Sequence, residues 1–179
     1  AGCEFENYAA DITRTWPING RFSAAQAEAY EWVLKAQLAS IDAVRAGRAF
    51  EEYHNVALRI LVEGLVAMGV LHGDIDELID TEAYKPYYMH RTGHWLGMDV
   101  HDVGTYHHQG ASRTLQPGMV VTVEPGLYFD AAGPAPDRFK GIGIRIEDDV
   151  LVTDSDPEVL TAGVPKTIAE IESVMAHAG

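Results

Sequence analysis

The stretch HRTGHWLGMDVHDVG contains three histidines that are close enough in sequence to act at one site. His90, His94 and His101 are separated by four and seven residues, with Trp95 and Leu96 between them. Imidazoles placed in this way can ligate a transition metal, transfer protons or donate a hydrogen bond to a developing oxyanion. The spacing alone does not divide these roles among the three.

Three carboxylates lie in otherwise apolar segments that alternate as β-strands do: Asp11 in YAADITRT, Glu124 in MVVTVEPG and Glu147 in GIGIRIEDD. Successive side chains on a strand point to opposite faces, so Glu147 and Arg145 face away from the isoleucines that enter the core. Glu124 and Asp11 are placed opposite apolar neighbours in the same way. An unpaired ionised carboxylate at such a position is strongly unfavourable. Each of the three therefore requires a cation.

Two kinds of cation could satisfy these carboxylates. Arg14 and Arg145 are close to Asp11 and Glu147 in sequence, and buried ion pairs would then explain the pattern. Arg14, however, faces away from Asp11 if both lie on one strand. The alternative is a divalent metal, because carboxylate oxygens and one imidazole suit Mn, Co, Zn or Fe. Three carboxylates exceed the charge that one divalent ion needs, which favours a two-metal centre with ions roughly 3.5–4 Å apart.

The overall composition predicts one compact unit and limits its partners. A chain of 179 residues with 47% hydrophobic side chains is long enough for a single core. Its 13 lysines and arginines against 27 aspartates and glutamates give a formal net charge of -14. Such a charge repels phosphate backbones and anionic membrane surfaces, so we expect no nucleic-acid partner and no membrane association.

The single cysteine, Cys3, excludes an internal disulfide and fits a reducing compartment, so we expect a cytoplasmic protein. The longest apolar region, VALRILVEGLVAMGVL, contains Arg59 and Glu63 at helical spacing. This pattern indicates a buried amphipathic helix rather than a membrane span.

Helices are predicted at residues 24–45, 50–68, 75–79 and 167–176, with Ser23 as the N-cap of the first and Gly69 after the second. The apolar face of the first helix is predicted to contain Tyr30, Val33, Leu34, Leu38 and Ile41. Strands are predicted within 3–16, with a turn at Asn7, over 119–129, with a break at Pro125–Gly126, and over 141–153. This order predicts an α+β fold in which helices cover one face of a curved antiparallel sheet.

Four blocks, YAADITRTWPINGRF, MHRTGHWLGMDVHDVGTY, QPGMVVTVEPGLYF and GIGIRIEDDVLVT, occur in this order along the chain. Together they resemble the signature blocks of the proline-specific metallopeptidases, aminopeptidase P and prolidase, whose pita-bread fold is shared with methionine aminopeptidase. The lengths of the second and fourth matches point most closely to aminopeptidase P. The resemblance runs from about residue 7 to residue 153 and implies a pita-bread catalytic domain.

The resemblance implies a role for each acidic residue of the pattern. Asp11 and Glu147 would each bridge two divalent metal ions, while His94 and Glu124 would complete the coordination of one ion. Manganese is the implied metal, with cobalt or zinc as alternatives. A hydroxide between the ions would attack the scissile carbonyl, and Glu124 would shuttle the proton.

The other two histidines of the opening stretch would act on the substrate. The resemblance implies that His101 donates a hydrogen bond to the carbonyl oxygen, and that His90 orients the substrate near its proline. Arg145 would help to bind the substrate and steady Glu147. We expect ordinary core or surface roles for the remaining histidines, His54, His72, His107, His108 and His177. Tyr106 and Tyr128 could border the pocket, but aromatic residues at strand ends more often serve in packing, and we expect that role for both.

The activity implied is release of the N-terminal residue from peptides whose second residue is proline. Prolidase, which cleaves Xaa-Pro dipeptides, is the nearest alternative, and a non-catalytic pita-bread binding module is a second. A two-metal phosphoesterase is less favoured, because Arg145 is the single basic group available to a phosphate. The resemblance also implies a homo-oligomer, either a dimer or a tetramer.

The resemblance implies one further metal ligand that this sequence does not contain. The family pattern has an aspartate eleven residues before Asp11, at a position that would precede Ala1. We therefore expect residues 1–179 to be the C-terminal part of a pita-bread catalytic domain. Its partner would be the remaining N-terminal part of the same enzyme.

Overall fold

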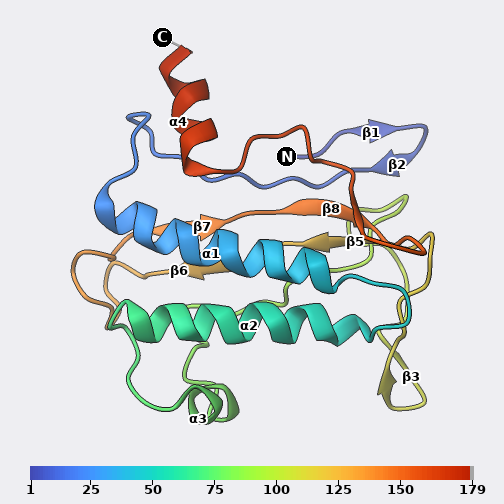
Figure 1. The fold of residues 1–179 in the computed structure, drawn as a ribbon, viewed down its shortest axis with the longest axis horizontal. Helices are drawn as coiled ribbons and strands as arrows, with labels where there is room; N and C mark the ends of the chain where they lie inside the picture. Colours follow the sequence, from blue (N-terminus) through green and yellow to red (C-terminus); the bar gives the residue numbers. More distant parts are fainter. Residues whose placement is uncertain (178–179) are drawn as a thin grey trace.

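The computed structural model describes residues 1–177, and its helices lie close to the predicted positions (Figure 1). They are α1 (Ala24–Ala43), α2 (Phe50–Ala67), α3 (Ile75–Asp80) and α4 (Ile168–His177). Ser23 begins α1 with a capping box, in which its hydroxyl accepts from the Gln26 N–H and the Gln26 side chain accepts from the Ser23 N–H. Gly69, with a φ of 70°, follows the end of α2 and continues the chain in a left-handed conformation.

All strand pairs are antiparallel, as predicted. Two hairpins are formed by β1 (Glu4–Phe5) with β2 (Tyr8–Ala9), and by β3 (His107–His108) with β4 (Ala111–Ser112). The central strands are β5 (Val120–Val123), β6 (Gly126–Tyr128), β7 (Gly143–Arg145), β8 (Asp148–Leu151) and β9 (Glu158–Val159). They pair in the orders β5-β8-β9 and β6-β7. The predicted break at Pro125–Gly126 is confirmed, because it separates β5 from β6.

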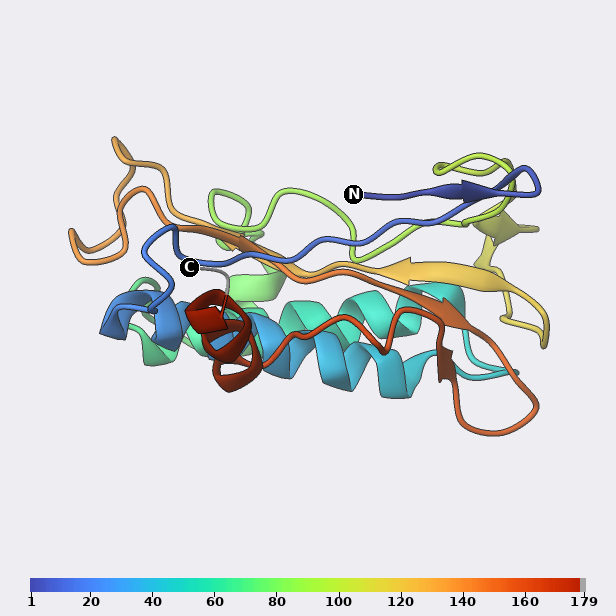
Figure 2. The same cartoon turned by 90° about the horizontal axis from the view of Figure 1, so that it is seen from above.

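The strands and the two long helices form two layers (Figure 2). In Figure 2, helices α1 and α2 lie side by side under the strands, whereas the N-terminal segment and the loop between α3 and β3 lie on the other side. Apolar side chains of the strands, such as Ile144, Ile146 and Leu127, join the helices in the larger core cluster. A second cluster surrounds Val121, Val123 and Val150. The face of the strands away from the helices is left for polar side chains.

Two of the predicted elements differ from the structure in an informative way. Residues 141–153 form two strands, β7 and β8, and Glu147 lies between them, paired only in an isolated bridge with Thr13. The second half of the segment 3–16 is extended but is not a continuous strand. Side chains make the hydrogen bonds that a ladder would have made: the Thr15 hydroxyl donates to the Arg145 carbonyl, and the Arg145 N–H donates to the Thr15 hydroxyl.

The predicted apolar face of α1 is correct except at one position. Tyr30, Val33, Leu34 and Ile41 are buried, but Leu38 is 49% exposed. Gln37 takes the buried place beside it, because its side-chain amide donates to a carboxylate in the interior. Within residues 1–177, no helix has both the length and the apolar character needed to cross a membrane.

Candidate metal centre

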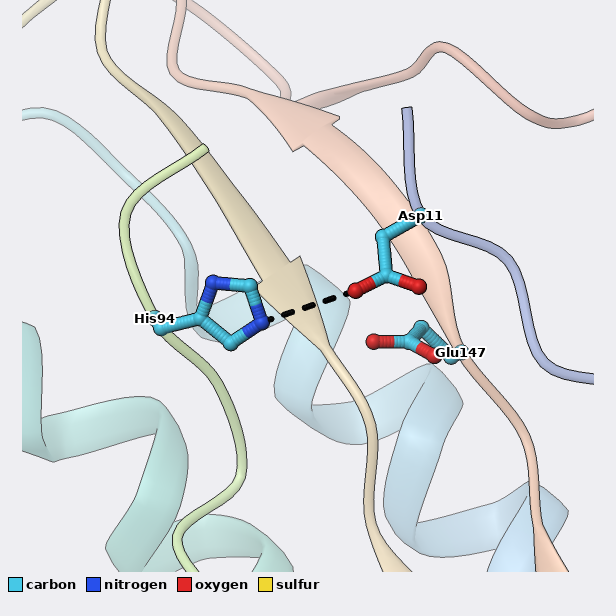
Figure 3. A group of neighbouring side chains, drawn as sticks. All are labelled: Asp11, His94 and Glu147. Carbon is cyan, nitrogen blue, oxygen red and sulfur yellow. Dashed lines mark ion pairs between the residues drawn. The ribbon is translucent and has the colours of Figure 1, made fainter. Parts of the chain in front are cut away.

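Asp11, His94 and Glu147 meet on the face of the strands away from the helices (Figure 3). One ligand atom from each lies within 4.8 Å of the others. Asp11 comes from the extended segment after β2, His94 from the loop between α3 and β3, and Glu147 from the junction of β7 and β8. Three segments far apart in the sequence thus place two carboxylates and one imidazole together, as the sequence predicted.

Hydrogen bonds to neighbouring backbone groups hold the His94 ring and its loop in a defined orientation. The His94 N–H donates to the Thr122 hydroxyl at 3.1 Å, and the Thr122 N–H donates to the His94 carbonyl at 3.0 Å, which fixes this loop beside β5. Nδ1 of His94 lies 2.9 Å from the Trp95 carbonyl oxygen and therefore carries the proton of a neutral ring. Nε2 is left with its lone pair directed into the site, the arrangement typical of a metal-ligating histidine.

Two carboxylates face that lone pair. Nε2 of His94 lies 3.4 Å from Oε1 of Glu124 and 3.7 Å from Oδ2 of Asp11. Burial lowers the pKa of His94, so the imidazole is neutral at neutral pH and does not attract the carboxylates. A cation between this nitrogen lone pair and the two carboxylates would stabilise all three groups. This geometry fits a divalent metal site.

The carboxyl groups of the site lie in surroundings that disfavour their ionised forms. Burial, followed by the nearby charges of Glu147 and Asp11, raises the pKa of Glu124 to about 7. Burial also raises the pKa of Glu147, and the neighbouring Asp11 contributes in the same direction. Several buried carboxylates with raised pKa values need a shared positive charge to ionise together.

Ion pairs with arginine do not supply that charge. Among residues 1–177, no arginine or lysine forms an ion pair with Asp11, Glu124 or Glu147. Arg14 instead pairs with Asp148, at 2.7 Å, which agrees with the expectation that it faces away from Asp11. The Arg145 guanidinium donates to the Thr13 hydroxyl at 3.3 Å. Of the two sources of cation that the sequence left open, the metal is therefore the one that the geometry favours.

The other predicted site residues line an open cleft beside the cluster. His90, His101 and Arg145 share this cleft with His94 and Glu124. The His101 ring lies edge-on to the His94 ring, with centroids 4.3 Å apart. Nε2 of His90 lies 2.7 Å from the Tyr128 hydroxyl, so this tyrosine, predicted to serve only in packing, orients a site residue. The cleft offers imidazoles and a guanidinium to a ligand that approaches the carboxylates.

Three supporting residues were not predicted from the sequence. The Thr13 hydroxyl donates to Oε2 of Glu147 at 2.5 Å. The backbone N–H of Asp11 donates to Oδ2 of Asp149 at 3.1 Å. Thr92, fully buried, accepts the Glu124 N–H at its carbonyl at 2.7 Å. Alternation could have indicated Asp149, since it lies two residues after Glu147, whereas contacts of Thr13 and Thr92 depend on tertiary structure.

His54 has the ordinary structural role that the sequence predicted. Its Nδ1 lies 2.8 Å from the Thr92 hydroxyl, which also lies 2.7 Å from the Tyr88 hydroxyl. Burial lowers the pKa of His54 to about 4, so the ring is neutral at neutral pH. This network connects α2 to the loop that carries His94 and contributes no ligand of its own.

The fold, a helix-backed antiparallel layer, and the donor set of carboxylate oxygens and imidazole are those expected of a protein that binds divalent metal ions. Residues 1–154 match the model of metallopeptidase family M24, and the chain belongs to this family. The family prediction made from the four sequence blocks is therefore confirmed.

Relatives with known names cover nearly all of this chain. It is 52% identical over 175 residues to the Xaa-Pro aminopeptidase of Haemophilus influenzae, a match that covers 98% of this chain and 40% of the relative. It is 51% identical to the Xaa-Pro aminopeptidase of Escherichia coli, covering 99% of this chain and 40% of that protein. The chain thus spans about 40% of the length of these relatives.

Solved structures agree with the fold. The structure of Pseudomonas aeruginosa aminopeptidase PepP superimposes with a TM-score of 0.97 at 56% identity, covering 98% of this chain and 40% of that one. Zinc-substituted E. coli aminopeptidase P in complex with product gives a TM-score of 0.94 at 50% identity, covering 99% of this chain and 40% of that one. The predicted fold class, helices covering antiparallel strands in a pita-bread catalytic region, is confirmed.

Proposed function

We propose that these residues form the catalytic region of a two-metal Xaa-Pro aminopeptidase, which releases the N-terminal residue from peptides with proline in second position. The observation that carries the proposal is the neutral Nε2 of His94 facing Asp11 and Glu124, with Glu147 in the same cluster. The relatives at 52% and 51% identity, both named Xaa-Pro aminopeptidase, support the substrate class.

In this proposal Asp11, His94, Glu124 and Glu147 would hold the metal, and Asp11 and Glu147 would serve both ions. When bound, the ions supply a Lewis acid for the scissile carbonyl and lower the pKa of the attacking water. Manganese is proposed from the oxygen-rich ligand set, with cobalt or zinc as alternatives. The Thr13 hydroxyl holds one oxygen of Glu147, which leaves the other free to ligate.

The chain's own groups carry the proton and orient the substrate. Glu124 lies at the edge of the cleft, where it takes the proton of the attacking water and passes it to the leaving nitrogen. His101 donates a hydrogen bond to the carbonyl oxygen as negative charge develops there. His90, held by Tyr128, and Arg145 line the same cleft and position the peptide near its proline.

The whole polypeptide, in this proposal, includes an N-terminal part beyond the described residues, and residues 1–179 are the C-terminal part of its catalytic domain. The support is that the matched region amounts to 40% of each of the two relatives. The N-terminal part supplies the further aspartate that the family resemblance implies. A homo-oligomeric state and a cytoplasmic location stay predictions from the sequence.

The substrate class is tested by comparing a tripeptide with a dipeptide. We expect the whole enzyme, loaded with manganese, to cleave Xaa-Pro-Xaa peptides efficiently and to release free Xaa, as measured by chromatography of the products. An otherwise identical peptide with alanine in place of proline serves as the control and should be cleaved much more slowly. Efficient cleavage of Xaa-Pro dipeptides alone would identify a prolidase instead.

The division of roles among the histidines gives a second test. His94→Ala should lose metal, because it removes a ligand, whereas His101→Ala should retain metal and lose rate by about 10²–10³-fold, the range expected for one oxyanion donor. Metal content is measured by elemental analysis and rate by a peptide assay of the whole enzyme. Equal metal content and equal residual rate in the two variants would contradict the assignment.

A further inference from the structure

Asp148 is a buried carboxylate next to the candidate metal site, and all of its hydrogen-bonding capacity is used. Oδ1 accepts from Arg14 at 2.7 Å and from the Thr161 hydroxyl at 2.6 Å. Oδ2 accepts from the Gln37 amide at 2.6 Å and from the Lys166 ammonium at 2.7 Å. A carboxylate has about four lone-pair positions. Four side chains, from three separate segments of the chain, therefore converge on one carboxylate.

Arg14 is engaged to the same extent. Its Nε donates to the Pro165 carbonyl at 2.9 Å, and Nη2 donates to the Val164 carbonyl at 3.0 Å as well as to Asp148. Its Nη1 donates to the backbone carbonyls of Thr13, at 3.0 Å, and of Glu147, at 2.6 Å. These five hydrogen bonds equal the number of N–H donors on a guanidinium.

Thr13 and Glu147 are the two residues that Arg14 joins, and their side chains form one edge of the metal site. Their backbones pair in an isolated antiparallel bridge, in which the Glu147 N–H donates to the Thr13 carbonyl at 3.0 Å. The Thr13 hydroxyl holds Oε2 of Glu147 at 2.5 Å. No regular ladder supports this junction of β7 and β8, so the Arg14 guanidinium takes the place of the missing ladder hydrogen bonds.

A buried ion pair of this kind adds little net stability compared with an apolar packing of the same volume. A fully satisfied buried network does, however, fix the relative positions of the groups that it joins. Here the network joins the backbone of the proposed ligand Glu147 to helix α1, through Gln37, and to the segment 161–166. That segment lies after residue 154, where the match to the family model ends.

We propose that Arg14, Asp148 and Lys166 are positioning residues for the candidate metal site, through which the segment 161–166 sets the affinity of the site for metal. The proposal rests on the metal site of the proposed function and adds residues that touch neither metal nor substrate. Arg14 orients the Thr13–Glu147 bridge, Asp148 orients Arg14, and Lys166 holds Asp148 from the C-terminal segment. The class of ligand affected is a divalent cation.

The test is the variant Arg14→Lys in the whole enzyme. Lysine keeps the charge beside Asp148 but cannot reach the Thr13, Glu147, Val164 and Pro165 carbonyls from one ammonium. We expect the dissociation constant for Mn²⁺, measured by titration calorimetry on the metal-free enzyme, to rise by about 10–100-fold, the usual effect of losing an outer partner of a ligand. The melting temperature of the metal-free enzyme is measured in parallel.

Two control variants separate positioning from general destabilisation. Val33→Ala removes buried volume from the larger core cluster and should lower the melting temperature without changing Mn²⁺ affinity by more than about twofold. Arg21→Ala removes an exposed ion pair with Glu172. This pair also joins a residue early in the chain to α4, and its loss should leave Mn²⁺ affinity unchanged.

Several results would overturn the inference. One is an Mn²⁺ affinity of Arg14→Lys within twofold of the unsubstituted enzyme, and another is a loss in Val33→Ala as large as that in Arg14→Lys. If Arg14→Lys does not fold, Lys166→Met, which removes one contact to Asp148, is judged by the same criteria with an expected loss of about tenfold. An unsubstituted enzyme that binds no Mn²⁺ would instead contradict the proposed function itself.

Discussion

Replacing Glu147 with alanine in the whole enzyme should abolish metal binding and peptidase activity together. Glu147 is 2% exposed, lies within 4.8 Å of the ligand atoms of Asp11 and His94, and is shared by both ions in the proposed site. Its loss removes a ligand from each ion, and the rate should fall by about 10⁴-fold or more, as for removal of an element on which the whole catalytic unit depends. Bound metal is measured by elemental analysis after gel filtration, and activity with an Xaa-Pro-Xaa peptide.

A matched control is Glu158→Ala, since Glu158 is an exposed glutamate on strand β9, which pairs with β8. This variant should retain both metal and rate. Glu147→Gln, which keeps the shape and the acceptor for the Thr13 hydroxyl, should fold normally and still bind metal weakly. Full metal occupancy in Glu147→Ala would show that the ligand assignment is wrong, whatever the rate.

Strand alternation places the carboxylates of the candidate metal site on the face away from the core, so the sequence could predict that face, whereas their role as ligands came from the family resemblance. Glu147 and Glu124 each follow an apolar residue that enters one of the two core clusters, so their side chains are expected on the opposite face. His94 followed from the family resemblance rather than from the spacing of the three histidines. The structure supports its place in the cluster through the Trp95 carbonyl, a contact that residue types do not reveal.

What the sequence could not provide was the support around these ligands. The pattern at 141–153 predicted one strand, whereas the structure has two. At the junction between them, Arg14 and Thr15 replace ladder hydrogen bonds, and these residues lie more than a hundred positions away in the sequence. In the sequence, Asp148 lies between Glu147 and Asp149 and looks like one more acidic residue of an acidic block. Only the folded chain shows that it faces the interior and joins Arg14 to Lys166. Local periodicity identifies the face of a side chain, but not its partners from distant segments.

A second large effect is expected when residues 1–179 are produced without any other part of the polypeptide. Several large apolar side chains are exposed around the N-terminal segment: Phe5 at 76%, Tyr8 at 64%, Trp16 at 54% and Ile18 at 99%. Several large apolar side chains exposed within one short stretch of sequence are consistent with an interface to another segment or chain. The isolated chain should therefore associate or be poorly soluble, as seen by gel filtration.

Buried polar atoms near the same segment point in the same direction. Oδ1 of Asp149 and Nε1 of Trp95 have no hydrogen-bond partner within the described residues 1–177, and both residues line a cleft with Tyr8, Ala9 and Ala10. A buried polar group without a partner costs about 1–3 kcal/mol. Asp149 also accepts from the backbone N–H of Asp11, so a partner for Asp149 would at the same time steady this proposed ligand.

We therefore expect residues 1–179 alone to cleave an Xaa-Pro-Xaa peptide, with added manganese, at a rate lower than that of the whole polypeptide by about 10²-fold or more, because the metal ligands are incomplete and insufficiently fixed. Co-expression with the N-terminal part of the enzyme should restore both solubility and rate, since that part supplies the further carboxylate and covers the exposed apolar side chains. A co-expressed N-terminal part whose metal-binding aspartate is replaced by alanine is the decisive control: it should restore solubility but not rate. If the 179-residue chain were instead a monodisperse monomer with the turnover of the whole enzyme, the four ligands Asp11, His94, Glu124 and Glu147 would be sufficient for catalysis, and the proposed contribution of the N-terminal part would be wrong.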